Sequence, residues 1–190
     1  MAEVLLSASN LTAVRGERLL FSGVSLEVHS GDALVLRGAN GSGKTTLLRI
    51  LAGLTQAGAG DVNRLSPFHW IAHRAGLKPH ETPRQHLSLW AKAWGADADV
   101  DAALKTVGLA RPADVPARLL SAGQRQRTAL ARLKLQVRPV WLMDEPFSAL
   151  DVDARAALEA DIVAHRAIGG AVITAIHGAP GFEPSGEVSL

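Results

Sequence analysis

GANGSGKT, residues 38–45, is the stretch that decides how this chain folds. It fits the pattern G-x-x-x-x-G-K-[ST], whose glycines let the backbone curl until successive N–H groups point at one anion. Residues 32–36 form a short apolar strand before it, and the apolar spacing of residues 45–54 predicts an amphipathic helix after it. The helix dipole adds to the attraction for an anion. We therefore expect phosphate binding by Gly38, Ala39, Asn40, Gly41, Ser42, Gly43, Lys44, Thr45 and Thr46.

Two side chains of this loop have separate predicted roles in binding a nucleotide. Lys44 is expected to reach the β- and γ-phosphates, and the Thr45 hydroxyl is expected to bind Mg²⁺. The alternative is a chance match in a glycine-rich chain. The flanking strand and helix favour the nucleotide interpretation, because they are the context that the motif requires.

A second stretch, residues 139–145, is an apolar strand that ends in two adjacent carboxylates, Asp144 and Glu145. An Asp at a buried strand end can help to hold Mg²⁺, and a neighbouring acid can accept a proton from an attacking water. A strand that ends at a charged surface turn is the alternative. Because a phosphate loop precedes this strand, we predict that Asp144 binds the metal and that Glu145 is the general base.

A third stretch, LSAGQ at residues 120–124, lies between the other two. Ser121 suits a helix N-cap, and Gln124 three residues later completes a capping box. A well-capped helix is therefore a sufficient structural explanation for residues 120–124. The small residues also leave an open helix start, which suits a phosphate brought from elsewhere.

Composition limits the remaining classes of function. The chain has 190 residues, 47% hydrophobic and 20% charged, as in an ordinary globular protein. Its formal net charge of +2 is too small to indicate nucleic-acid binding, and we expect no nucleic-acid partner. The chain has no cysteine, which excludes disulfides, thiolate metal sites and cysteine nucleophiles. The first ten residues do not resemble a signal peptide, and no apolar run approaches the roughly 20 residues that span a bilayer.

Strand and helix signals alternate along the chain and then change character. Strands are predicted at residues 4–8, 19–28, 68–72, 140–143 and 171–175, and a helix at residues 151–168. Residues 83–94, 100–107 and 123–137 show helical patterns without strand signals. We predict a single α/β domain over residues 1–190, with a core of residues 1–77 and 138–190 and a helical subdomain of residues 78–137. Residues 178–190 are expected to be loop with one short strand.

Taken in order, the three stretches resemble the ATPase domains of ABC transporters, from Gly38 to His177. LSAGQ is similar to that family's signature, residues 148–151 to its D-loop, and His177 to its switch histidine. The resemblance implies a P-loop NTPase fold of the ABC type, with a mainly parallel core sheet, antiparallel N-terminal strands and an inserted helical subdomain. It implies catalytic roles for Glu145 and His177. It also implies a head-to-tail homodimer, in which the signature residues Ser121, Ala122, Gly123 and Gln124 face the partner's ATP. Asp151 is by the same resemblance the aspartate of the D-loop.

The chain departs from the family pattern at two positions. The family usually has an aromatic residue that stacks on adenine, whereas the corresponding stretch here, residues 12–16, has no ring. Arg15 is our candidate for stacking its guanidinium on the base. The family's lid glutamine is replaced by His73, which thereby takes the position that contacts the metal ion.

Two features resemble one branch of the family, the ATP-binding subunits of bacterial haem exporters for cytochrome c maturation. They are Ala122 in place of a signature glycine, and His73 at the lid position followed by residues 76–78, Gly-Leu-Lys. That resemblance implies ATP hydrolysis linked to release of a haem-loaded periplasmic chaperone. It also implies integral membrane partners, and an indirect, peripheral location on the cytoplasmic side of the inner membrane. The alternatives are another ABC transporter, a soluble ABC-type ATPase and a P-loop kinase. Trp90 and Trp94, four residues apart, are either part of a docking face or, as the apolar pattern favours, core residues of the helical subdomain.

Overall fold

The computed structural model describes residues 2–190, which divide into two compact units. The first unit contains residues 1–70, 138–145 and 159–190, and the second contains residues 71–137 and 146–158. The second unit therefore takes in residues 71–77 and 146–158, which the sequence analysis placed in the α/β core. Each unit is described below by itself.

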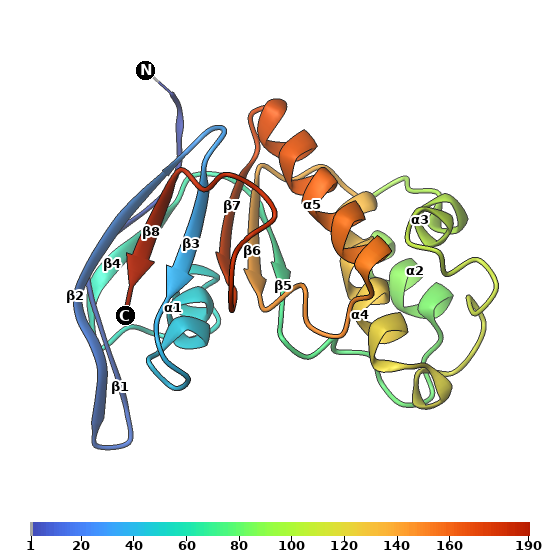
Figure 1. Cartoon of the computed structure of the whole chain (residues 1–190), viewed down its shortest axis with the longest axis horizontal. Coiled ribbons are helices and arrows are strands. Elements are labelled where there is room, and N and C mark those ends of the chain that lie inside the picture. Colours follow the sequence, from blue (N-terminus) through green and yellow to red (C-terminus); the bar gives the residue numbers. More distant parts are fainter. Residues whose placement is uncertain (1) are drawn as a thin grey trace. The chain divides into compact units, whose positions relative to one another are not determined.

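The first unit contains an antiparallel sheet of order β2-β1-β4 (Figure 1). Its strands are β1 (Val4–Arg15), β2 (Arg18–His29) and β4 (Ala59–Arg64). β1 extends well beyond the predicted residues 4–8, because pairing with β2 continues through several register shifts to the hairpin turn. β4 was not predicted. Its residues are almost all exposed, so it shows no apolar alternation, and its pairing with β1 makes it a strand.

The same unit contains a five-stranded sheet of order β5-β6-β7-β3-β8, with parallel pairing of β6 with β7, β7 with β3 and β3 with β8. The strands are β3 (Ala33–Arg37), β5 (Phe68–Ile71), β6 (Val140–Asp144), β7 (Ala171–Ala175) and β8 (Gly186–Ser189). β6 and β7 are buried at every position, which explains their continuous apolar runs. β8 is the short strand expected after residue 178.

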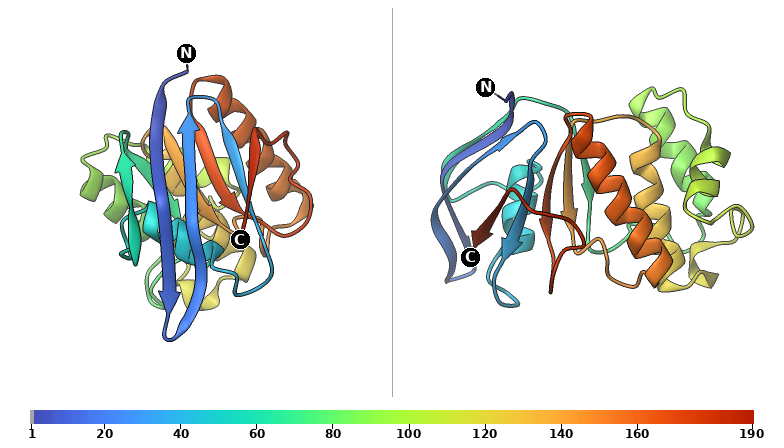
Figure 2. Two further views of the ribbon diagram at one scale, coloured as in Figure 1. Left: turned by 90° about the vertical axis from the view of Figure 1, so that its left-hand side faces the viewer. Right: turned by 45° about the horizontal axis from the view of Figure 1, so that its top comes forward.

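Helix α1 (Lys44–Leu51) joins the two sheets into one core. Its buried face, which includes Leu47, Leu48 and Leu51, packs with apolar residues of both sheets. The ribbon of the helix lies between the two sheets in Figure 2. The helix ends before the predicted residue 54, because Gly53 adopts a left-handed conformation (φ 70°). The carboxyl ends of β3, β6 and β7 meet at one edge of the sheet, so the residues that follow them are brought together there.

The second unit is helical. It contains α2 (Pro83–Trp94), α3 (Val100–Thr106), α4 (Ala122–Ala131), two short 3₁₀ turns and the first half of α5 (Val152–Ala167). α2 begins at a capping box, in which Thr82 and Gln85 exchange hydrogen bonds. Trp90 and Trp94 are partly buried and pack against the core of α2, α3 and α4. This packing supports the core interpretation of the two tryptophans.

Candidate functional site

The phosphate loop follows β3 and leads into α1, as the sequence predicts. Gly43, the residue before α1, has φ 112°, and a Cβ there would lie 2.9 Å from the Phe21 ring. Gly38, at the other end of the loop, has φ 144°, and a Cβ there would lie 2.5 Å from Ser42 Oγ. Both positions therefore require glycine for conformation and for space.

Lys44 lies under the loop and is only 7% exposed. Its Nζ donates hydrogen bonds to the carbonyl oxygens of Gly38 at 2.8 Å and Ala39 at 3.1 Å. The ammonium group is thus held at the centre of the curled backbone, with three donors that can be redirected to an anion. This is the placement that a phosphate-binding lysine requires.

Thr45 and Asp144 come from distant parts of the chain and contact each other directly. Thr45 Oγ1 donates a hydrogen bond to Asp144 Oδ2 at 2.9 Å. Asp144, the last residue of β6, is 2% exposed. A hydroxyl and a buried carboxylate oxygen, side by side below the phosphate loop, are hard oxygen ligands of the type that Mg²⁺ prefers.

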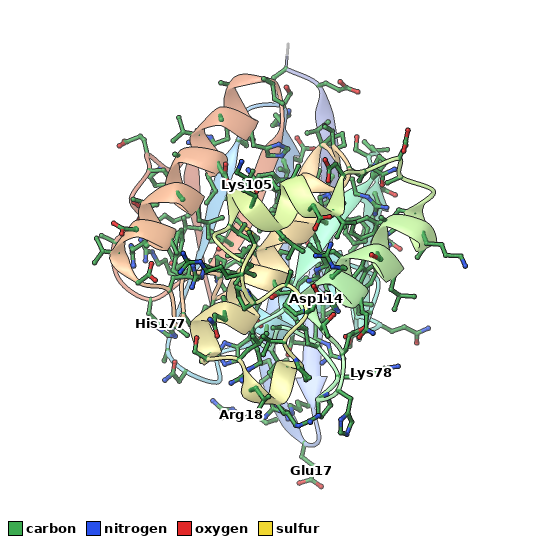
Figure 3. The ribbon with its side chains drawn as sticks, turned by 90° about the vertical axis from the view of Figure 1, so that its right-hand side faces the viewer. Glu17, Arg18, Lys78, Lys105, Asp114 and His177 are labelled. Carbon is green, nitrogen blue, oxygen red and sulfur yellow. The ribbon has the colours of Figure 1, made fainter. Side chains whose placement is uncertain are left out.

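Glu145 and His177 form a second contact at the same sheet edge. Glu145 has φ 49°, and its N–H donates to the carbonyl of Ala175 on β7 at 2.9 Å. His177 Nε2 lies 3.2 Å from Glu145 Oε1, and because an ionised carboxylate only accepts hydrogen bonds, the imidazole is the donor. The His177 side chain is 53% exposed, in agreement with its place at the surface in Figure 3.

A cavity of about 280 Å³ opens beside these groups. It is lined by Arg15, Leu20, Asn40, Gly41, Gly43, Lys44, Thr45, Thr46 and Glu145. Arg15 is exposed at the end of β1, next to the β1–β2 turn. Leu20, on β2, was not singled out in the sequence. No sequence motif marks it, and it reaches the cavity only because β2 pairs back along β1.

The predicted signature residues lie in the helical unit, at the start of α4. The Ser121 hydroxyl accepts from the Gln124 N–H at 3.1 Å, and Gln124 Oε1 accepts from the Ser121 N–H at 2.8 Å. The capping box is thus confirmed. A Cβ on Gly123 would lie 2.6 Å from the carbonyl oxygen of Ala149, so this glycine permits the close approach of the segment after β6.

A second cavity, of about 380 Å³, lies within the helical unit. Its lining includes His73 and two arginines, Arg74 and Arg125, and it also includes Ala122, Gln126, Ser148 and Ala149. Asp151 is the N-cap of α5, because its Oδ1 accepts from the Ala154 N–H at 2.8 Å. This helix-capping contact accounts for Asp151 structurally, and its assignment to the D-loop stays a prediction.

The described residues divide the predicted site into two groups. The first unit brings together Lys44, Thr45, Asp144, Glu145 and His177, whereas His73, the signature and Asp151 belong to the second unit. Within residues 2–190 no three His, Cys, Asp or Glu side chains form a group that could hold a metal. A metal at Thr45 and Asp144 would therefore need phosphate oxygens or water as further ligands, as is usual for Mg²⁺.

Comparison with known proteins agrees with this arrangement. The family model for ABC transporters matches residues 21–148. The chain is 56% identical over 186 residues to the cytochrome c biogenesis ATP-binding export protein CcmA of Hyphomonas neptunium, covering 98% of this chain and 96% of the relative. It is 44% identical to the protein of that name from Gluconobacter oxydans, covering 91% of this chain and 81% of the relative.

Solved structures show the same fold. An ATP-binding subunit of an ABC transporter superposes with a TM-score of 0.81 at 24% identity, covering 91% of this chain and 79% of the other. An ABC transporter ATP-binding protein from Pyrococcus furiosus also superposes with a TM-score of 0.81, at 19% identity, covering 97% of this chain and 96% of the other. With the family model and the near full-length relatives, these similarities show that the chain belongs to the ABC transporter family, among the ATP-binding export proteins of cytochrome c biogenesis.

Proposed function

We propose that this ABC ATPase subunit hydrolyses ATP in sites that two copies of the chain build together. One copy supplies the phosphate loop, Asp144, Glu145 and His177, and the other supplies the signature at the start of α4. The observation that carries the proposal is the cluster at the carboxyl ends of β3, β6 and β7, where Thr45 contacts Asp144 and His177 contacts Glu145. The capped, glycine-bearing start of α4 supports the signature's role.

Each residue of the cluster has a defined task in the proposed reaction. Lys44 releases the carbonyls of Gly38 and Ala39 and donates to the β- and γ-phosphates. The Glu145 carboxylate accepts a proton from the water that attacks the γ-phosphorus, the bond to the β–γ bridging oxygen breaks, and ADP and phosphate leave. His177 donates to the γ-phosphate in place of its present contact with Glu145.

Thr45 and Asp144 are the residues that would hold Mg²⁺. Their oxygens are adjacent, and Asp144 is buried where its charge gains from a cation. The ion would neutralise charge on the phosphates. His73 does not belong to the same unit, and we keep its lid role as a proposal tied to the second cavity, whose wall it forms.

Arg15 and Leu20 are our candidates for the adenine contact, because they line the cavity beyond the phosphate loop. A guanidinium plane can stack on a base, and a leucine can cover it. Arg15→Ala should weaken ATP binding several-fold, and unchanged affinity by calorimetry would remove Arg15 from the site. The exposed Arg18, on the same hairpin but not among the lining residues, is the matched control.

The relatives are named as ATP-binding export proteins of cytochrome c biogenesis, and this supports a more specific assignment. We place the chain in a haem exporter whose ATP hydrolysis drives release of a haem-loaded periplasmic chaperone. Among the residues that the structure describes, no helix is long and apolar enough to cross a membrane. From the export role of the relatives, we propose integral membrane partners, with the chain bound indirectly at the cytoplasmic face of the inner membrane.

A pull-down from solubilised membranes tests this assignment. The Glu145→Gln form, loaded with ATP, should retain its membrane subunits because hydrolysis no longer opens the complex. Recovery of haem-handling membrane proteins would support the exporter. Recovery of unrelated permease subunits would indicate another ABC transporter, and quantitative release into the soluble fraction would indicate a soluble ABC-type ATPase.

A further inference from the structure

Arg37 is the last residue of β3 and directly precedes the phosphate loop. Its guanidinium makes three hydrogen bonds in the first unit. Nη1 donates to the carbonyl oxygen of Gly178, and Nε and Nη2 donate to Glu187 Oε1 at 3.0 Å and 2.9 Å. The side chain thus connects the turn after β7 with β8.

The two partners of Arg37 differ in how firmly they are held. Glu187 lies on β8, which pairs in parallel with β3, so it is fixed by backbone hydrogen bonds. Gly178 lies in an exposed turn, has φ 79° and has nothing within 4 Å of a Cβ built on it. A glycine in open space has wide conformational freedom, so a charge-assisted bond to its carbonyl restricts the turn strongly.

The turn matters because Gly178 directly follows His177. The His177 imidazole is 53% exposed and reaches Glu145 Oε1 at 3.2 Å. An exposed side chain at the end of a strand takes its direction from the peptide on either side. Ile176, which precedes His177, is buried and thereby fixed, and the carbonyl of Gly178, which follows it, is held by Arg37.

We propose that Arg37 is a positioning residue for ATP hydrolysis: by holding the Gly178 carbonyl it keeps the His177 imidazole directed at Glu145, and Glu187 orients Arg37. This inference rests on the function proposed above. Arg37 is not among the residues that line the nucleotide cavity. Its loss should therefore change turnover and leave ATP binding intact.

Arg37→Gln and Glu187→Ala are the direct tests. Displacement of a catalytic side chain by about 1 Å can cost on the order of 100-fold in rate, so we expect kcat to fall about 10- to 100-fold. KM and ATP affinity should stay within about twofold. Arg37→Lys, which keeps one charged donor for Gly178, should recover part of the lost kcat.

Arg166→Gln is the matched control. Arg166 holds the same final segment, because it donates to the carbonyl of Glu183 at 2.6 Å and to Ser185 Oγ at 3.2 Å. Its Nε donates to the carbonyl of Gly31 at 2.8 Å, and none of these three bonds goes to Gly178. If Arg37 merely anchors this segment, both variants should lower thermal stability and kcat alike. Under the proposal Arg166→Gln keeps wild-type kcat.

A double-mutant cycle with His177→Ala decides whether Arg37 acts through the histidine. The double variant should be no slower than His177→Ala alone, because the imidazole that Arg37 positions is already gone. The inference would be overturned if Arg37→Gln lowered kcat in the His177→Ala background by the same factor as in the wild type. It would also be overturned if Arg37→Gln alone kept wild-type kcat while His177→Ala lowered it.

The His177 imidazole resonance provides a readout that does not depend on hydrolysis. Identified by its absence in His177→Ala, it should shift in Arg37→Gln and remain in place in Arg166→Gln. If the wild-type chain with its partners hydrolyses no ATP, the proposed function fails, and this resonance alone decides the inference. An unshifted resonance in Arg37→Gln would refute the positioning role even in an active enzyme.

Discussion

At the scale of single residues, Glu145 carries the sharpest prediction. Its carboxylate lines the nucleotide cavity and touches His177, whereas the phosphate contacts are assigned to the loop before α1. Glu145→Gln removes the base and keeps the shape, so kcat should fall about 10²- to 10⁴-fold while ATP still binds. Phosphate release and calorimetric titration measure the two quantities. Glu183→Gln, an exposed substitution outside the cavity, should leave both unchanged.

Unchanged turnover in Glu145→Gln would remove this residue from catalysis. The adjacent Asp144 could not take over the same task, because its carboxylate is buried and bonded to Thr45. The two neighbouring acids thus have different surroundings. The buried Asp144 is suited to bind a metal, whereas Glu145, which lines the cavity, is suited to act as a base.

At the scale of elements, α4 depends on one glycine. A Cβ on Gly123 would lie 2.6 Å from the Ala149 carbonyl, so Gly123→Ala must displace either the helix start or the segment after β6. We expect a loss of about 1–3 kcal/mol in the free energy of unfolding and a lower kcat with ATP affinity retained. Thermal melting and ATPase assays check both effects.

Ala122→Gly is the informative comparison for that prediction. It gives the sequence LSGGQ, lies one residue away and adds no atoms, so it should cost at most the roughly 1 kcal/mol that glycine costs relative to alanine in a helix. If Gly123→Ala were equally mild, the close approach to Ala149 would not govern the helix start.

Helix α2 contains a buried histidine, His86, and we expect it to make the stability of the fold depend on pH. Trp90 Nε1 donates to His86 Nε2 at 3.2 Å, so the proton of neutral His86 is on Nδ1, which lies 3.0 Å from Glu81 Oε2. Burial lowers the pKa of His86 below 6.5, an effect that Glu81 opposes and Arg132 reinforces. Burial also lowers the pKa of Arg132, to about 10, so that group stays charged at neutral pH.

The sign of the pH effect follows from that shift. Below the unfolded pKa of about 6.5 the unfolded chain binds a proton at this position that the folded chain does not, so stability falls as pH decreases through this window. The melting temperature should therefore drop between pH 7 and pH 5.5, with a smaller drop in His86→Asn. Burial lowers the pKa of His165 in the same direction, so a residual slope in His86→Asn is expected. A slope equal to that of the wild type would show that His86 does not contribute.

At the scale of the whole molecule, the shared site can be tested by mixing two inactive variants. Lys44→Ala should lose ATP binding, because Lys44 is the cation at the centre of the loop, and Ser121→Arg should block the signature. In a head-to-tail dimer of one copy of each, one of the two sites keeps an intact loop and an intact signature. About half of randomly formed dimers are mixed, so activity should return to about one quarter of the wild-type value.

A monomeric kinase-like site gives a different result in this mixing experiment. Ser121→Arg alone would then keep nearly full activity, and the mixture would show only the sum of its two components. Lys105→Ala, a lysine of α3 outside the nucleotide cavity, is the control for the lysine substitution. Undiminished ATP affinity in Lys44→Ala would contradict the assignment of the phosphate loop itself.

Much of this protein can be predicted from its sequence, because its motifs are local. A glycine loop between a strand and a helix, a capping box at Ser121 and Gln124, and buried strands such as β6 and β7 each depend on residues a few positions apart. Their backbone geometry and hydrogen bonds are set by neighbours in the chain, so the pattern alone indicates them. The resemblance to a family with this order of motifs extended the prediction to the role of each site residue.

Only the tertiary structure decided the features that join distant residues. The polar strand β4 exists because β1 offers it an edge, and Leu20 reaches the cavity through the β1–β2 pairing. The contacts from His177 to Glu145 and from Arg37 to Gly178 span 32 and 141 residues. The sequence by itself therefore determined which chemistry the chain carries. The parallel sheet, which brings the ends of separate strands to one edge, decided which of those groups meet.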